Sequence, residues 1–313
     1  MYKKILLAST ILLVPLSVTQ KIQVNGFDKQ IEYITKEEEK PCYTTLYEEN
    51  KEEWNTKYPD LENKLTEIKQ KLIAQGHEEQ HIKKLLRNAE IDERVTNFFR
   101  RNILKSADRG EITFEEFSRR INLDWFVNNA HSFAEEYQNI LLKTEKKDGV
   151  DYRYVVGILG IETRFGTMEN LGDHNLVNSL VTQYATTNRK RFAIRELSHT
   201  LTLSKEYNED LTEIKGSYAG AIGVGQWIPS SIVHYSKINN IDDLFTVEGI
   251  IPSISNYLKV HGWDPQGNGQ ELTKNTRNFR AVRAYNHSDT YVKIVNEIAK
   301  GVNMEKINAH AGI

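Results

Sequence analysis

The hydrophobic positions of the chain recur with helical spacing from about residue 54 onward. Leu61, Leu65, Ile68 and Leu72 follow one another at three- and four-residue steps, which places them on one face of a helix that Gly76 ends. Strand-like alternation is scarce, and neither a glycine-rich phosphate loop nor an internal repeat occurs. The pattern therefore predicts a mainly α fold. Further helices are expected at about 82–86, 95–103, 113–121, 124–143, 151–162 and 190–207.

The first twenty residues differ from the rest of the chain. Lys3 and Lys4 precede an apolar run over residues 5–18, which is typical of a secretory signal peptide and too short to span a bilayer comfortably. An uncleaved N-terminal anchor that tethers the protein to a membrane is the alternative. The sequence thus predicts an exported protein of the periplasm or cell envelope. The remaining predicted parts are a polar linker at 21–53, an N-terminal helical region at 54–150 and a core at 151–305.

Composition and charge narrow the class of partner. Of the 313 residues, 39% are hydrophobic and 27% are charged, a balance that is typical of globular and not of disordered proteins. The formal net charge is −2 and no stripe of lysine and arginine appears, so nothing favours nucleic acid as a partner. A neutral glycan or a small molecule fits at least as well. Cys42 is the single cysteine, so no intrachain disulfide can form.

A nearly uninterrupted apolar segment at residues 154–166 carries one carboxylate, Glu162. A helix that is apolar on all faces is buried, so we expect Glu162 at the edge of a core. Burial disfavours the charged form of a carboxyl group and raises its pKa, which suits a group that donates a proton to a leaving oxygen. The alternative is a structural glutamate that pairs with Arg164 or Arg189 near the helix end.

Residues 216–231 contain a glycine-rich loop. Four glycines within ten residues let the backbone approach a neighbouring group closely, and Ser217 and Gln226 offer hydrogen bonds beside the flat ring of Trp227. Pro229 then starts a predicted helix. A tight structural turn is the alternative explanation of this loop.

A polar and aromatic segment at residues 284–292 precedes a predicted amphipathic helix. An aromatic ring packs on the face of a sugar and an amide bonds to its hydroxyls, so Tyr285 and Asn286 suit a glycan ligand. The alternative is a capped helix start, with Ser288 or Asp289 as the N-cap. That alternative accounts for the aspartate but leaves the tyrosine and the asparagine unexplained.

Taken in order, the three segments resemble the motifs of the B-type membrane-bound lytic murein transglycosylases. That family has an apolar helix ending in E-T-x-[FWY]-G, then S-[FY]-A-G-A-x-G-x-x-Q-[FW]-x-P-S-S, then a Y-N-x-S block. The chain matches these motifs at residues 162–166, 217–231 and 285–288, and the stretch at 256–263 is also similar. The resemblance covers about residues 65–301, and its middle motif is long and specific.

The resemblance implies a lysozyme-like helical domain with a substrate groove and an extra N-terminal helical region. The implied reaction cleaves the MurNAc-GlcNAc β-1,4 bond of peptidoglycan and forms 1,6-anhydromuramic acid ends, so the enzyme would be a lyase that needs no cofactor and no metal. Glu162 matches the catalytic acid/base of the family. The expected partner is a glycan strand, and the protein is expected to be a monomer. The positions expected to line the groove are Ser217, Gln226, Tyr257, Tyr285, Asn286 and Tyr291.

Two positions depart from the family pattern. The family usually has a calcium loop after the second motif, whereas residues 236–244 lack the spaced oxygen ligands and the glycine of such a loop, so no calcium is expected there. We match an aromatic ligand contact of the family to Phe117, which lacks a hydroxyl group, so it stays open whether this residue lines the groove.

Other mechanisms and functions stay open at this point. Many glycosidases place a second carboxylate about 5–10 Å from the first, and Asp173 is the only nearby candidate. A single-acid scheme, in which the N-acetyl group of the substrate stabilises the positive centre, fits better. A hydrolytic muramidase, a non-catalytic peptidoglycan-binding protein and an unrelated helical interaction protein are the alternatives.

Overall fold

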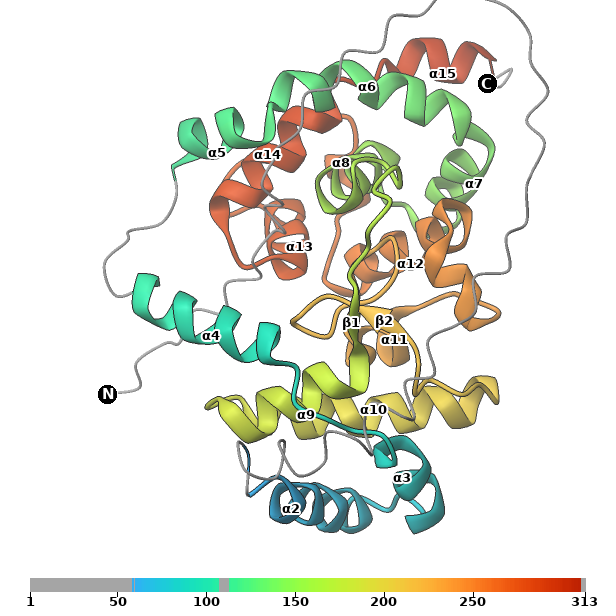
Figure 1. Ribbon diagram of the computed structural model, residues 1–313. Coiled ribbons are helices and arrows are strands. Elements are labelled where there is room, and N and C mark those ends of the chain that lie inside the picture. The colour runs from blue at the N-terminus through green and yellow to red at the C-terminus, as the bar shows by residue number, and fades with distance from the viewer. Residues whose placement is uncertain (1–57, 59, 107–112, 311–313) are drawn as a thin grey trace, which may run out of the picture. The chain divides into compact units, whose positions relative to one another are not determined.

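The computed structural model describes residues 58, 60–106 and 113–310 (Figure 1). The described residues from Lys64 onward belong to one compact unit. A second unit spans Thr10–Asn63, of which only Tyr58 and residues 60–63 are described. The predicted signal peptide and linker therefore lie outside the described residues, and the boundary at residue 150 stays a prediction. Every helix in the described part of the chain is too short or too polar to cross a membrane.

The described residues are mainly helical, which confirms the predicted fold class. Two short strands, β1 (His174–Asn175) and β2 (Lys215–Gly216), pair antiparallel. The α-helices are α2 (Leu61–Ala74), α3 (Glu79–Leu86), α4 (Glu93–Ser106), α5 (Phe114–Ile121), α6 (Leu123–Glu136), α7 (Gln138–Asp148), α8 (Tyr152–Thr163), α9 (Leu176–Thr186), α10 (Lys190–Tyr207), α11 (Pro229–Tyr235), α12 (Val247–Val260), α13 (Arg277–Tyr285), α14 (Asp289–Lys300) and α15 (Met304–His310). The 3₁₀-helices are η1 (Ile241–Phe245) and η2 (Pro265–Gly267).

One helix prediction is wrong, and helix α9 was not predicted. The helix predicted at 124–143 is wrong as a single element, because the backbone turns at Tyr137 (φ −104°, ψ 18°) and separates α6 from α7. Neither glycine nor proline marks this break, so the hydrophobic spacing alone does not reveal it. The sequence also gave no prediction for α9. Most of that helix is buried, and a helix buried on all sides lacks the one-sided pattern by which amphipathic helices are recognised.

Helix α8 forms the centre of the fold. Ten of its twelve residues are buried, which confirms that this apolar segment lies in the core. The helices α6, α7, α12 and α14 all contact it and enclose it in Figure 1. At Gly157, a Cβ atom would lie only 2.6 Å from the carbonyl oxygen of Val295, so this glycine allows α14 to pack closely against α8. The helix ends at Thr163, where Arg164 and Phe165 adopt left-handed conformations.

The strand pair connects the loop that follows α8 with the glycine-rich loop. β1 begins eleven residues after the end of α8, and β2 leads into the glycine-rich loop; His174 pairs with Gly216. The side-chain nitrogen of Gln226 also donates a hydrogen bond of 3.0 Å to the carbonyl oxygen of Leu171. These contacts hold the glycine-rich loop beside the chain that leaves the C-terminal end of α8.

Candidate active site

Glu162 is the penultimate residue of α8. The side chain stays partly accessible although most of its helix is buried. Protein atoms surround the carboxyl group closely enough that burial raises its pKa to about 7. The hydroxyl of Tyr291 donates a hydrogen bond of 2.8 Å to Oε1 and partly opposes this effect, because it stabilises the charged form. Near neutral pH, Glu162 can therefore exist both as an acid and as a base.

Neither arginine that could have neutralised Glu162 pairs with it. Among the described residues, no ion pair joins Glu162 to Arg164 or to Arg189. The guanidinium carbon of Arg164 lies 4.2 Å from the ring centroid of Trp125, and that of Arg189 lies 4.1 Å from the ring of Phe192. The alternative interpretation of Glu162 as one half of a structural ion pair is therefore wrong.

Two predicted tyrosines, Tyr285 and Tyr291, lie near the carboxyl group, and a third, Tyr257, packs on Tyr285. Burial raises the pKa of Tyr285 and of Tyr291 well above the ordinary value, and the nearby charge of Glu162 raises both further. Tyr257 meets Tyr285 edge to face, with ring centroids 5.1 Å apart. All three hydroxyl groups are therefore neutral at physiological pH and donate hydrogen bonds: Tyr291 donates to Glu162, Tyr285 to the carbonyl oxygen of Gly225 and Tyr257 to that of Ala284.

The N-terminus of α14 fixes the position of Tyr291. Ser288 is the N-cap of this helix, and its hydroxyl accepts a hydrogen bond from the backbone N–H of Tyr291. The interpretation of this segment as a capped helix start is thus confirmed for Ser288, whereas Asp289 pairs with Arg283 and Lys274. The Ser288 cap fixes the start of α14 and so places Tyr291 in its first turn, where the tyrosine hydroxyl reaches Glu162 on α8.

Tyr285 connects the end of α13 to the glycine-rich loop. Its hydroxyl donates a hydrogen bond of 2.7 Å to the carbonyl oxygen of Gly225 and accepts one from the indole nitrogen of Trp227. Gln226 lies between these two contacts in the left-handed region (φ 51°) and also bonds to Gly223. The loop, Tyr285 and Glu162 are therefore parts of one continuous group of contacts.

Ser217 and Asn286 are less closely connected to Glu162. The hydroxyl oxygen of Ser217 accepts the backbone N–H groups of Ala219 and Ala221, at 3.3 and 3.1 Å. This is the role expected from the structural-turn interpretation of the loop. Asn286 is buried next to Tyr285, and its backbone oxygen accepts the N–H of Ser288. The ligand contacts predicted for both side chains stay predictions.

Two aromatic residues that were not predicted as site residues, His261 and Tyr235, pack on Tyr257. His261 stacks on Tyr257, with centroids 4.0 Å apart and planes 20° from parallel. The ring of Tyr235 meets that of Tyr257 edge to face, at 4.8 Å. The spacing of Tyr257 and His261, four residues apart at the end of a helix, is the one signal that could have indicated their contact. The position of Tyr235 depends on the packing of α11 against α12, which no local pattern shows.

Asp173 is exposed and bound elsewhere. Its carboxylate forms an ion pair of 2.6 Å with Arg94 and lies near His174. Partial burial acts to raise the pKa of Asp173, but the hydrogen bond and the charge of Arg94 outweigh it and hold this pKa below its usual range. A carboxylate held in this way is poorly suited to act beside Glu162. Phe117 is buried in α5, which packs against α14.

The segment at residues 236–244 does not resemble a calcium loop in its geometry. The Asp243 carboxylate accepts the backbone N–H groups of Asn239 and Asn240, and Asn240 completes a capping box at the start of η1. The Asp243 carboxylate is thus already bound by backbone N–H groups of the same segment. In the described part of the chain, no group of three histidine, cysteine or acidic side chains is arranged to hold a metal ion. That the protein needs no metal stays a prediction.

Comparison with known proteins agrees with the motifs and the fold. The Transglycosylase SLT domain family matches residues 60–273. The membrane-bound lytic murein transglycosylase B of Escherichia coli K12 is 33% identical over 141 residues, which are 44% of this chain and 38% of that relative. The match thus spans well under two thirds of that relative's length.

Solved structures share the fold at low sequence identity. SltB3 of Pseudomonas aeruginosa in complex with NAG-NAM-pentapeptide has a TM-score of 0.65 and 20% identity, covering 76% of this chain and 78% of SltB3. The lytic transglycosylase Slt35 of E. coli in complex with calcium has a TM-score of 0.63 and 22% identity, covering 78% of this chain and 94% of Slt35. These matches confirm the predicted lysozyme-like helical fold. The chain belongs to the transglycosylase SLT domain family.

Proposed function

We propose that this chain is a lytic transglycosylase that cleaves the glycan strands of peptidoglycan with Glu162 as its single acid/base. One observation carries the proposal: a carboxyl group with a pKa raised to about 7 by burial accepts a hydrogen bond from Tyr291, and a further neutral tyrosine, Tyr285, lies near it. Among the described residues, no second acidic side chain lies close enough to shift that pKa. A one-carboxyl mechanism fits this arrangement better than a two-carboxyl mechanism.

In the first step, protonated Glu162 donates its proton to the glycosidic oxygen as the bond to the muramic acid carbon breaks. The substrate's own N-acetyl group stabilises the positive charge on that carbon. In the second step, the Glu162 carboxylate accepts the proton of the sugar's 6-hydroxyl, whose oxygen attacks the same carbon. The product is a 1,6-anhydro ring, no water is consumed, and Glu162 regains its proton. Tyr291 orients the carboxyl group in both steps.

The comparisons support peptidoglycan as the substrate. The curated relative is named a murein transglycosylase, and SltB3 was solved with a fragment that contains both sugars of the glycan strand and a pentapeptide. We propose that the glycan strand binds in a groove lined by the residues that match the family motifs: Ser217, Gln226, Tyr257, Tyr285, Asn286 and Tyr291. Export to the periplasm or envelope, by a signal peptide or with an N-terminal tether, belongs to the same proposal.

Replacement of the carboxyl group tests the proposal. Glu162→Gln keeps the side chain's shape and can still accept the Tyr291 hydrogen bond, so the variant should fold normally by circular dichroism yet fail to clear purified sacculi. Glu169→Gln, on the exposed loop that follows α8, is the matched control and should keep wild-type activity. Cleavage by Glu162→Gln at the wild-type rate would remove this residue from the mechanism.

The mass of the released muropeptides separates this reaction from hydrolysis. The wild-type protein should release anhydro ends, 18 mass units lighter than hydrolytic products because no water is added. Reducing ends that carry an added water would identify a hydrolytic muramidase. Binding to sacculi without any release would identify a non-catalytic glycan-binding protein.

A further inference from the structure

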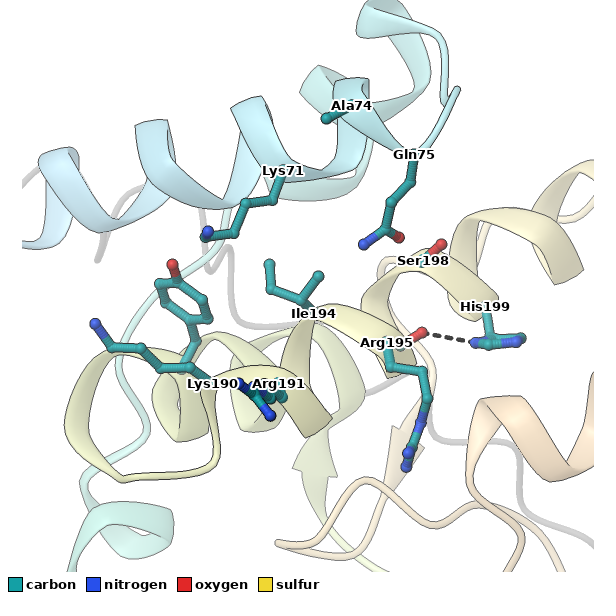
Figure 2. Close-up of a pocket in the computed structure, with 10 residues that line it drawn as sticks. Lys71, Ala74, Gln75, Lys190, Arg191, Ile194, Arg195, Ser198 and His199 are labelled. Carbon is teal, nitrogen blue, oxygen red and sulfur yellow. Dashed lines mark hydrogen bonds between the residues drawn. The ribbon is translucent and has the colours of Figure 1, made fainter.

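A cavity of about 540 Å³ lies between the C-terminal end of α2 and helix α10. Figure 2 shows Lys71 and Gln75 extending from the α2 side toward α10. None of its lining residues belongs to the candidate active site, and in Figure 1 the helices α2 and α10 lie away from α8. Its volume falls in the range of small-ligand sites. Its lining comes from Lys71, Ala74, Gln75, Tyr184, Lys190, Arg191, Ile194, Arg195, Ser198 and His199.

The lining carries positive charge and no acidic residue. Lys71 and Arg191 have no acidic partner among the described residues. The ammonium of Lys190 lies 5.3 Å from the ring centroid of Tyr184, and this contact does not neutralise its charge. Arg195 forms an ion pair of 2.7 Å with Glu196. The Glu67 carboxylate, which is paired with Lys64 and accepts a hydrogen bond from the Tyr184 hydroxyl, lies near enough to Lys190 to interact with its charge. In the described part of the chain, Lys71 and Arg191 are therefore the two cations of the lining that are available to pair with an anion.

The placement of two of these cations opposes folding stability. Lys190 and Arg191 occupy the first turn of α10, where the helix dipole disfavours positive charge, and the N-cap residue Arg189 makes no side-chain capping bond. An anion that bound beside this turn would interact favourably with the dipole and with both side chains. Ala74 and Ile194 give the same cavity an apolar part that can receive methyl groups.

We infer that this cavity binds the peptide side chains of peptidoglycan through their carboxylates. A short peptide with free carboxylates and small apolar side chains matches both the charge and the apolar part of the lining. The inference rests on the proposed function, because it takes the peptides from the same cell-wall substrate. The cavity holds the enzyme on a neighbouring part of the wall while Glu162 acts on a glycan strand.

Calorimetric titration with a soluble pentapeptide that has free carboxylates tests the inference. The wild-type protein should bind this peptide at least tenfold more tightly than the same peptide with amidated carboxylates, and added salt should weaken the binding. The Lys71→Gln/Arg191→Gln variant should lose at least tenfold in affinity. The control variant Lys143→Gln/Lys146→Gln removes two exposed charges from α7 and should bind as the wild type does.

Equal binding of the free and amidated peptides, or equal binding by both double variants, would overturn the inference. A third titration uses vesicles that contain an anionic phospholipid. Should Lys71→Gln/Arg191→Gln lose vesicle binding while the wild-type protein ignores the peptide, the cavity would bind a lipid headgroup and the inference would fail. Failure of the proposed function is a separate result, because it appears as a wild-type protein that releases no muropeptides.

Discussion

The Tyr291 hydroxyl and the Glu162 carboxyl group lie 2.8 Å apart, joined by a hydrogen bond that the tyrosine donates. The two residues are 129 positions apart in the sequence, and the close packing of α14 on α8 brings them together. Burial raises the pKa of Glu162, whereas this bond lowers it. The two effects together give the carboxyl group a pKa of about 7, so near neutral pH this one residue can both donate and accept a proton.

Removal of this hydrogen bond should shift the pH dependence of the reaction upward. In Tyr291→Phe, the charged form of Glu162 loses a stabilising donor, so its pKa rises above about 7. The reaction begins with protonated Glu162, so activity should persist to a pH about one unit higher than in the wild type. The rate at the optimum should fall about tenfold, because the carboxyl group is no longer held in place.

Tyr154→Phe is the control for this experiment. Tyr154 is also buried, but its hydroxyl donates to the carbonyl oxygen of Gln270. This variant should keep the wild-type pH profile of sacculus clearance, whatever it costs in stability. An unshifted profile in Tyr291→Phe would contradict the role assigned to the hydrogen bond.

Replacement of Asp173 tests whether a second carboxylate takes part. Asp173→Asn removes an exposed charge that is paired with Arg94, so cleavage of sacculi should stay within about twofold of the wild-type rate. Arg94→Gln removes the other partner of the same ion pair and should likewise leave the rate of sacculus cleavage within about twofold of the wild-type rate. A loss of a hundredfold or more in Asp173→Asn alone would indicate a two-carboxyl mechanism.

A second carboxyl group with a raised pKa should control stability and not activity. Burial, and then the charge of Asp151, raise the pKa of Glu145 to about 7. The folded state therefore binds a proton that the unfolded state releases above about pH 4.5, so this group makes the protein less stable as pH rises from about 4.5 to 7. Glu145→Gln should be more stable than the wild type at pH 8 by about 2 kcal/mol, and no more stable at pH 4.

Urea unfolding at both pH values measures this difference. Glu213→Gln, at an exposed position, should change the free energy of unfolding equally at pH 4 and pH 8. If Glu145→Gln behaves like this control, the burial of Glu145 does not penalise its charged form. Muropeptide release should be unaffected, since Glu145 lies on α7 beside the N-terminal end of α8, whereas Glu162 is near the C-terminal end of α8.

The sequence predicted the elements whose signals are local. The apolar run of α8 identified a buried helix with one carboxylate, and Pro229 and Ser288 correctly indicated helix starts. The motif order also placed Tyr285 and Tyr291 with Glu162, although no local pattern shows that contact. The loop that contains Gln226 could be recognised by its glycines, but its attachment to Leu171 could not.

The rest depends on packing between distant segments. The stacking of His261 on Tyr257 and the bond from Trp227 to Tyr285 arise where α12, α13 and the loop meet. The break at Tyr137 lacks the glycine or proline that usually marks a helix end. For Ser217 the sequence left two roles open, because the same hydroxyl group can stabilise a turn or bind a ligand.

Titration of the Glu162 carboxyl group tests the central claim most directly. In protein labelled with ¹³C at the glutamate side chain, the Glu162 carboxyl resonance is identified by its absence in Glu162→Gln. Its chemical shift should follow a protonation midpoint near pH 7 in the wild type, and a higher one in Tyr291→Phe. A midpoint near the ordinary value of 4.5 would mean that Glu162 carries no proton at neutral pH, and would contradict its role as the acid.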